Sequence, residues 1–195
     1  MRILVVFDHP YQQSYCAALL QAIREGAAAA GHELDLIDLF REGFDPVLKQ
    51  EELKRYAEGY TDDPQVIDYQ KRIDEADHLV LIFPIWWQVM PALTKGFLDR
   101  VLLPPWAFEE TEGIVPSGKL RHLSATVLTT MGFPHWYYRI HFGNALKGAL
   151  LRGTLGFVGI RKRRWLNCGN IARVSDAKRR RDLRRVRRSF EKLRG

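Results

Sequence analysis

Short apolar runs that alternate with longer helical patterns constrain the fold of this chain more than any other feature. Five runs of six or seven residues are typical of strands, and they span residues 2–7, 33–39, 78–84, 124–130 and 163–169. The runs at 78–84 and 124–130 are typical of strands buried on both faces, whereas 33–39 alternates with one polar face. Segments with helical spacing lie at residues 14–30, 65–76, 92–103, 144–159 and from 176 onward. This alternation predicts parallel strands joined by right-handed crossovers, and therefore one α/β domain with three layers.

Five parallel strands with helices on both faces suit the flavodoxin-like arrangement. In such sheets a ligand binds beyond the carboxyl ends of the strands, where the connections diverge to opposite faces. Three loops therefore matter most for function, at residues 8–14, 84–91 and 129–143.

Basic residues are concentrated at one end of the chain. The whole chain carries a net charge of +7, whereas residues 173–195 contain eleven lysines and arginines against three acidic residues. We predict a helix at about 176–194, within a single domain of residues 1–195, whose arginines face solvent. Its apolar stripe, at three and four residue spacing, consists of Leu183, Val186, Phe190 and Leu193. The alternative is that this helix binds RNA or an anionic membrane. The sequence has no RNA-binding signature, so we expect no nucleic-acid partner. Weak contact with a membrane surface remains an open alternative.

Cysteine usage and hydropathy indicate a cytoplasmic location. Cys16 and Cys168 are too few for a disulfide framework and too far apart for a CxxC motif. The most apolar window, residues 79–93, is shorter than the ~20 residues needed to cross a bilayer. The first ten residues reach an acid and a proline before any cleavage site, so we expect no signal peptide.

The first loop, HPYQQSYC, runs directly from a strand into a helix. A helix start offers unpaired amides and a partial positive charge to a phosphate, and His9 and Ser14 can add donors. The loop matches neither GxGxxG nor the P-loop, which disfavours an ordinary dinucleotide or triphosphate site. The plainer interpretation is that Ser14 only caps the helix.

The second and third loops are aromatic. FPIWWQVMP places Trp86 and Trp87 after a buried strand, and TTMGFPHWYYRIHFG carries Tyr137, Tyr138 and His141. The plainer interpretation is that these rings pack on neighbouring loops or a second subunit. Together with a phosphate-ready helix start, however, two aromatic loops predict a site for a flat ligand with a phosphate tail, such as FMN.

These segments resemble the flavodoxin-like NAD(P)H:quinone oxidoreductases. The resembling segments are HPYQQSYC, GHELDLIDLF, EADHLVLIFPIWWQVMPALTKGFLDRVLL, LTTMGFP with WYY, and LLRGTLGFVGI. They cover most of the chain in the family's order, and the block from FPIWW to KGFLDRV is the most specific. The resemblance implies a three-layer sandwich with a five-stranded parallel sheet. It also implies an enzyme that passes a hydride from NADPH or NADH through bound FMN to a quinone or similar small acceptor.

The resemblance assigns roles to individual residues. Contacts with the flavin phosphate and ribityl chain are implied for His9, Ser14, Tyr15 and Cys16. Contacts with the isoalloxazine ring and its pyrimidine edge are implied for Pro84, Ile85, Trp86, Trp87, Thr129, Thr130, Met131 and Gly132. Tyr137, and His141 after a gap of two residues, match the catalytic pair thought to assist charge changes on the reduced flavin. No metal is implied.

Two departures from the family pattern concern the pocket. Met131 stands where many members have glycine, which either narrows the pocket or removes a special backbone conformation. Cys16 stands where others have asparagine, which removes an amide from the phosphate side.

Three further expectations come from the resemblance. Family members are usually homodimers that share the site between subunits. FAD is the alternative cofactor, although the lack of a long extra C-terminal domain favours FMN. A second class of function is regulatory, because some relatives are accessory subunits of membrane transporters and a flavin can serve as a redox sensor.

Overall fold

The computed structural model describes residues 1–56, 59 and 61–194, and its centre is one parallel sheet. The strands are β1 (Arg2–Phe7), β2 (Glu33–Asp38), β3 (His78–Pro84), β6 (Ser124–Thr130) and β7 (Arg163–Cys168). Their order across the sheet is β2-β1-β3-β6-β7, with parallel pairing throughout. The predicted five-stranded parallel sheet is confirmed.

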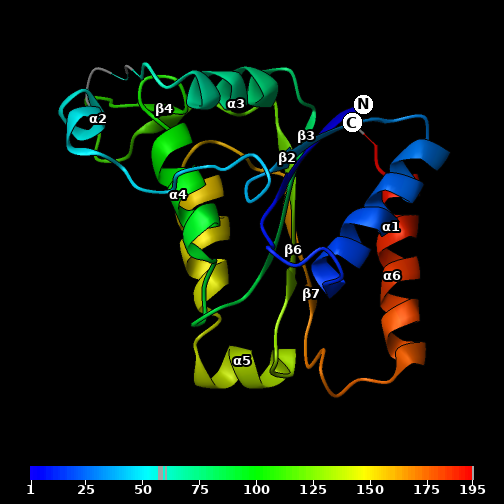
Figure 1. Ribbon diagram of the computed structural model, residues 1–195. Coiled ribbons are helices and arrows are strands. Elements are labelled where there is room, and N and C mark those ends of the chain that lie inside the picture. The colour runs from blue at the N-terminus through cyan, green and yellow to red at the C-terminus, as the bar shows by residue number, and fades with distance from the viewer. Residues whose placement is uncertain (57–58, 60, 195) are drawn as a thin grey trace.

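Helices cover both faces of the sheet (Figure 1). One face carries α1 (Tyr15–Ala29) and α6 (Asp176–Glu191), and the other carries α3 (Pro64–Asp74), α4 (Ala92–Val101) and the π-helix η2 (Lys147–Leu155). The short elements α2 (Gln50–Lys54), β4 (Phe108–Glu109) and β5 (Ser117–Gly118) lie toward one end, and α5 (His135–His141) lies at the opposite end. The predicted three-layer arrangement is therefore confirmed.

The alternation of side chains along each strand builds a core on either face. Ile3, Val5 and Phe7 of β1 pack with α1 and α6, whereas Leu4 and Val6 pack with the helices of the other face. Because both faces are covered, β1 and β3 are apolar at nearly every position, which is why they could be predicted from the sequence.

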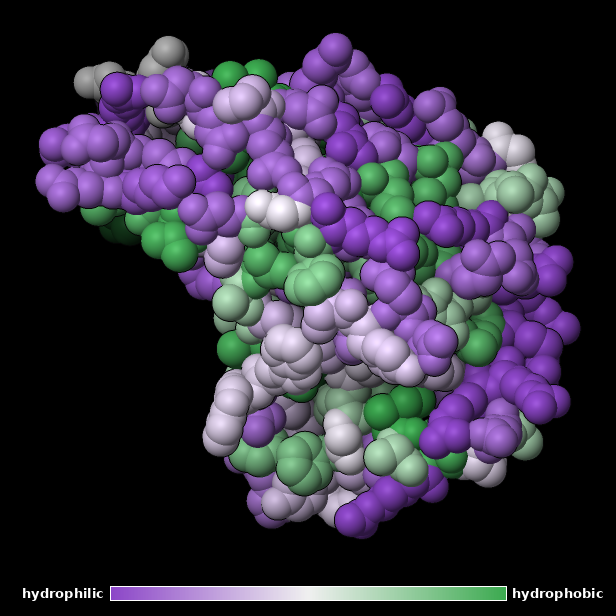
Figure 2. Space-filling view, viewed as in Figure 1, coloured by the Kyte–Doolittle hydropathy of each residue, from purple (hydrophilic) through white to green (hydrophobic). Residues whose placement is uncertain are grey.

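The basic helix docks as its apolar stripe predicts. Val186 and Phe190 are buried, and Leu183 and Leu193 pack partly buried against the same cluster. Gly26 of α1 lets α6 approach closely, because a Cβ at this position would lie 2.4 Å from the carbonyl oxygen of Arg187. The stripe therefore has a packing role, while hydrophilic residues cover the outer side of α6 (Figure 2).

Three helix predictions need correction. The α-helix expected at 144–159 is the π-helix η2, and the third loop contains the short helix α5. The C-terminal helix ends at Glu191 instead of 194. In the described part of the chain, no helix combines the length and apolarity that a membrane crossing requires.

One side of the molecule is hollowed between the part that contains α2 and the end that contains α5 (Figure 2). A cavity of about 400 Å³ lies there between α4 and η2, and Met90, Leu98 and Phe157 are among its lining residues.

Candidate functional site

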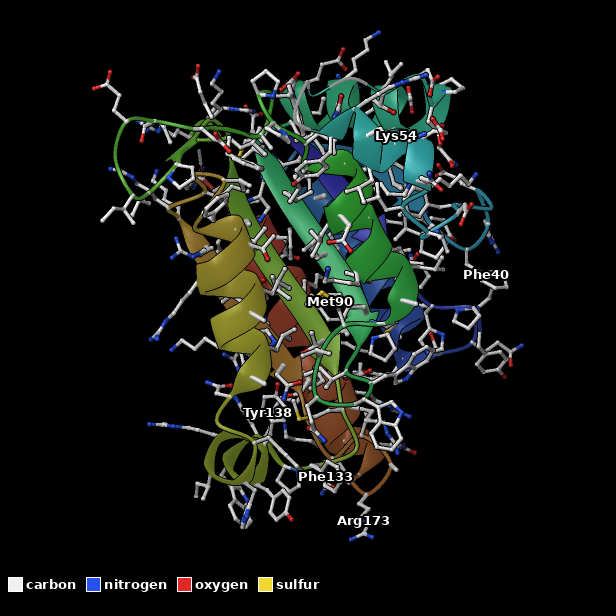
Figure 3. The ribbon with its side chains drawn as sticks, turned by 90° about the vertical axis from the view of Figure 1, so that its left-hand side faces the viewer. Phe40, Lys54, Met90, Phe133, Tyr138 and Arg173 are labelled. Carbon is white, nitrogen blue, oxygen red and sulfur yellow. The ribbon has the colours of Figure 1, made fainter. Side chains whose placement is uncertain are left out.

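The three predicted loops meet at the carboxyl end of the sheet. The amide of Ile85 donates to the carbonyl oxygen of Thr130 at 2.7 Å, which joins the second loop to the third. The rings of His9 and Trp86 lie 6.4 Å apart, which joins the first loop to the second. Figure 3 shows Phe133 and Tyr138 of the third loop at this end, below Met90 of the second. We call this region the mouth.

The first loop presents the start of α1 to the mouth. Ser14 is the N-cap, and its Oγ accepts the Ala17 amide at 3.2 Å. The first turn of α1 contains no acidic residue, so its partial positive charge is not neutralised there. The amides of Tyr15 and Cys16 have no partner within the helix, because they occupy its first two positions. This turn can therefore bind a phosphate through backbone donors.

His9 contributes a neutral donor beside this turn. Its Nδ1 accepts the Tyr11 amide at 3.0 Å, so a neutral ring carries its proton on Nε2. Burial lowers the pKa of His9, which favours the neutral form near pH 7.

The side chains of Tyr15 and Cys16 point away from a ligand at the helix start. The Tyr15 hydroxyl donates to the Arg179 carbonyl oxygen at 2.9 Å, which ties α1 to α6. The Cys16 thiol is 1% exposed and lies 3.4 Å from the Thr130 hydroxyl. Burial raises the pKa of Cys16 to about 12, so the thiol stays protonated. Tyr15 and Cys16 can therefore bind a phosphate only through their backbone amides. The cysteine at position 16, where family members have asparagine, packs beneath the loop.

The second loop contains a tight turn that displays the tryptophans. Trp86 and Val89 exchange two backbone hydrogen bonds of 3.1 Å. Between them, Trp87 and Gln88 have φ values of 46° and 72°, a combination typical of a type I′ turn and uncommon for residues other than glycine, asparagine and aspartate. Trp87 is 95% exposed and Trp86 48% exposed, whereas Pro84 is buried and Ile85 half-buried. A strained turn that exposes two large rings indicates a binding role more than a packing role.

Tyr138 fixes this turn from the third loop. Its hydroxyl donates to the carbonyl oxygen of Gln88 at 2.6 Å and accepts the Leu146 amide at 2.9 Å, and its ring is fully buried. The sequence drew attention to Tyr138 only as one aromatic donor among several. The helical spacing of Pro134, Tyr138 and Phe142 is the signal that could have placed it on the inner side of α5.

Asp8 was missed by the sequence analysis. It is 2% exposed, and its Oδ2 accepts the Thr94 hydroxyl at 2.6 Å and the Thr94 amide at 2.9 Å. Burial raises the pKa of this carboxyl group. Asp8 therefore joins the end of β1 to the first turn of α4 and fixes where the second loop returns to the fold. An acidic residue directly after a buried strand is the signal that could have identified it.

The predicted residues of the third loop divide into buried and exposed ones. Thr129 is fully buried, and its hydroxyl donates to Asn167 and accepts the Trp165 indole N–H. Thr130 and Met131 are also buried, and Met131 belongs to the core and is absent from the residues with positive φ. Gly132 is exposed, with open space where a Cβ would be. The Met131 side chain thus fills the core rather than the mouth, and backbone groups are what this segment offers a ligand.

The predicted catalytic pair lies on α5. The rings of Tyr137 and His141 stack with centroids 4.1 Å apart, and the Phe133 ring stacks with that of Tyr137 at 5.5 Å. Spacing by four residues on a helix places such rings together. Within the described residues no ring contact joins this stack to Trp86 or Trp87. The two aromatic groups are separate parts of the same end of the molecule.

The comparisons with known proteins agree with this geometry. A family model for the flavodoxin-like fold matches residues 1–192. The chain belongs to this family. Among relatives of this flavodoxin-like protein, an uncharacterized NAD(P)H oxidoreductase of Haemophilus influenzae is 30% identical over 182 residues, which cover 90% of this chain and 87% of the relative. A quinone-type ribosyldihydronicotinamide dehydrogenase of Rattus norvegicus is 28% identical, with 82% of this chain and 78% of the relative covered.

A solved structure is similar over the whole length. The NAD(P)H:quinone oxidoreductase from Methanothermobacter marburgensis is 29% identical to this flavodoxin-like protein. It superposes with a TM-score of 0.88 and covers 100% of this chain and 99% of its own.

The mouth of this flavodoxin-like protein fits a flavin mononucleotide. A phosphate suits the open amides at the start of α1, and a flat ring suits the exposed tryptophan turn beside it. The space around Gly132 leaves room for a ring edge. Among the described residues, no group of three or more His, Cys, Asp or Glu side chains is placed to hold a metal ion.

Proposed function

We propose that this flavodoxin-like protein binds FMN at the mouth and uses it to carry two electrons from NADH or NADPH to a quinone or similar small acceptor. One observation carries the proposal: a helix start without acidic residues and an exposed tryptophan turn lie at one edge of the sheet, linked by the 6.4 Å contact of His9 with Trp86. The activities named for the rat and Methanothermobacter proteins support it.

The chain's own residues bind and orient the cofactor. The amides of Tyr15 and Cys16 and the Nε2–H of His9 hold the phosphate, which needs no charged side chain because the helix start supplies partial positive charge. The turn of Trp86 and Trp87 holds the ring, and Tyr138 and Asp8 keep that turn in position. FMN held there would supply the redox chemistry, which is two-electron transfer from the nicotinamide to the acceptor.

Proton handling falls to α5 in this proposal. Tyr137 and His141 are stacked, which holds the two rings in one orientation and leaves the imidazole exposed to water. Such a pair can stabilise negative charge that develops on a nearby ligand.

We also propose a homodimer in which the exposed aromatic residues meet a second subunit. Three large apolar side chains at this end of the molecule are exposed, namely Trp87 (95%), Trp136 (63%) and Ile140 (70%). Exposed apolar side chains of this size are typical of a surface that contacts another protein. The match of the family model to residues 1–192 supports one flavin-binding domain that includes α6. None of the three relatives described above bears the name of a transporter subunit, so the regulatory alternative gains no support from them.

A flavin reconstitution experiment tests the function. Protein incubated with FMN and then desalted is expected to keep the flavin absorption bands, lose them on addition of NADPH, and regain them with menadione over many turnovers. Trp86→Ala should retain less flavin, while Phe40→Ala, which removes an exposed ring outside the mouth, should behave as the unmodified chain. Protein that retains no flavin, or retains it without turnover, would overturn the proposal.

A further inference from the structure

A basic pocket lies at the amino end of the sheet, opposite the mouth. Its volume is about 270 Å³, and its charged and polar lining consists of Lys162, Arg163, Arg164, Arg194, His78 and Ser124. His78 begins β3 and Pro84 ends it, so roughly 20 Å of strand separates this pocket from the mouth. Both chain ends lie near the same end of the molecule (Figure 1). The flavin proposal leaves the pocket unexplained.

Arg164 is a partly buried cation without a counter-charge. Its Nε donates to the Thr126 hydroxyl at 2.8 Å, and its guanidinium carbon lies 5.5 Å from the centre of the Phe190 ring. Its Nη2 is buried and has no acceptor among the described residues. Burial lowers the pKa of Arg164, as expected for a guanidinium withdrawn from water without a carboxylate partner. Leaving such a charge uncompensated costs free energy that a bound anion would recover.

A chain of hydrogen bonds fixes Arg164 in place. Because the Thr126 hydroxyl accepts from Arg164, its own proton is free to go to Nε2 of His78, 2.8 Å away. Nδ1 of His78 then donates to the Ser124 hydroxyl at 2.7 Å. Burial lowers the pKa of His78 to about 4, so the ring is neutral at pH 7 and this pattern is satisfied. The pocket wall is therefore rigid before any ligand binds.

The other cations of the pocket also have no acidic partner. No ion pair of Lys162, Arg163 or Arg194 occurs within residues 1–56, 59 and 61–194. On α6, three basic side chains have acidic partners, in the pairs Lys178 with Asp182, Arg179 with Asp176, and Arg187 with Glu191. Asp77, which adjoins His78 in sequence, accepts a hydrogen bond from the Arg2 amide at 2.7 Å. The cations that line the pocket therefore have no carboxylate partner among the described residues.

We propose that this pocket binds a small soluble anion that carries a phosphate or pyrophosphate group. Guanidinium and ammonium groups are the usual ligands of phosphate oxygens, and Lys162, Arg164 and Arg194 line this pocket together. Arg163 also lines it, but its Nη1 already donates to the carbonyl oxygens of Ile160 and Arg161. The volume lies just below the range of sites for drug-sized ligands, which suits a compact phosphorylated metabolite rather than a polymer. The inference does not depend on the flavin at the mouth.

Titration calorimetry with inorganic pyrophosphate at constant ionic strength tests the site. We expect saturable binding of one pyrophosphate per chain in protein saturated with FMN, because FMN fills the other phosphate-binding place. Lys162→Gln and Arg194→Gln alter exposed side chains and should each weaken binding roughly tenfold, the loss expected for one charge-assisted contact. Arg184→Gln removes the same charge from the exposed face of α6, outside the pocket, and should leave the affinity unchanged.

Three results would overturn the inference. The first is equal affinity of the unmodified chain and of both pocket variants. The second is pyrophosphate binding that FMN abolishes, which would place the anion at the start of α1. The third is binding to phosphatidic acid vesicles that depends on Lys162 and Arg194 without any binding of pyrophosphate, which would identify a lipid surface as the ligand. Because the pocket variants are measured with and without FMN, a protein that fails to bind flavin still gives a clear answer.

Discussion

The Tyr138 hydroxyl donates a 2.6 Å hydrogen bond to the carbonyl oxygen of Gln88, fifty residues earlier in the chain. Gln88 is the second of two consecutive residues with positive φ, and the same hydroxyl accepts the Leu146 amide. One buried side chain therefore joins the tryptophan turn to the segment that follows α5. The conformation of the turn depends on this support, because Trp87 and Gln88 do not favour it on their own.

Tyr138→Phe should loosen the turn and destabilise the fold. The substitution leaves the Gln88 carbonyl and the buried Leu146 amide without their partner, at a cost of about 1–3 kcal/mol in the free energy of unfolding. FMN affinity should fall as well, since the turn that holds the ring is no longer fixed. Urea unfolding and flavin fluorescence titration measure the two effects.

Tyr137→Phe is the matched control. The Tyr137 hydroxyl has no hydrogen bond within the described chain, so its removal should leave the free energy of unfolding nearly unchanged. The same substitution should reduce turnover. Equal stability of the Tyr138 and Tyr137 variants would show that the bond to Gln88 does not support the turn.

Much of the fold could be predicted from local pattern. A strand covered on both faces is apolar at successive positions, so β3 was evident as HLVLIFP, and β6 was evident as SATVLTT because threonine and valine are typical of strands. The docking stripe of α6 was visible because helical spacing alone determines it. The parallel pairing of the strands followed from their alternation with helices.

The features that the sequence did not predict depend on contacts between distant residues. Asp8 and Thr94 are 86 residues apart, and Tyr138 and Gln88 are 50 apart, so no local pattern pairs them. The sequence predicted a helix at 144–159, but nothing in its local pattern showed that the helix is the π-helix η2.

Substitution of Trp87 should affect the stability of the fold and the affinity for FMN in opposite directions. Trp87→Gly relieves a positive φ and should raise the free energy of unfolding by about 1 kcal/mol, since the ring is 95% exposed and little packing is lost. The same change should weaken FMN binding by removing part of the flat surface. Thermal unfolding with and without FMN measures both effects.

A second substitution at this position checks the explanation. Trp87→Asn introduces a residue that tolerates positive φ but lacks the ring, so this variant should bind FMN as weakly as Trp87→Gly does. If both variants bind FMN as tightly as the unmodified chain, the exposed ring at position 87 does not contact the flavin.

Gly26→Ala should separate α1 from α6. The added Cβ would lie 2.4 Å from the Arg187 carbonyl oxygen and 3.0 Å from the Phe190 Cβ, so one helix must shift. We expect a loss of about 1–3 kcal/mol in unfolding free energy, typical of overpacking, although alanine is the better helix former. Gly148→Ala, where nothing lies within 4 Å, should be neutral or stabilising in the same urea titration. Unchanged stability of Gly26→Ala would contradict close packing of the basic helix.

The neutral His78 should make stability depend on pH. Burial lowers its pKa from 6.5 to about 4 in the folded chain, so between these values the unfolded chain binds more protons. The free energy of unfolding should therefore rise as the pH increases from 4 to 6.5, by up to about 3 kcal/mol from this residue. Asp8 acts in the opposite direction just above pH 3.8, because burial raises its pKa and its stabilising contribution is lost as the pH rises.

Comparison with a variant isolates the His78 contribution from that of Asp8. His78→Gln should flatten the dependence between pH 4 and 6.5, whereas His122→Gln, which changes an exposed histidine, should preserve it. Urea unfolding of the three proteins at intervals across this range gives the slopes directly. A slope that survives His78→Gln would mean that burial does not keep His78 neutral, and the hydrogen-bond pattern from Thr126 through His78 to Ser124 would lose its basis.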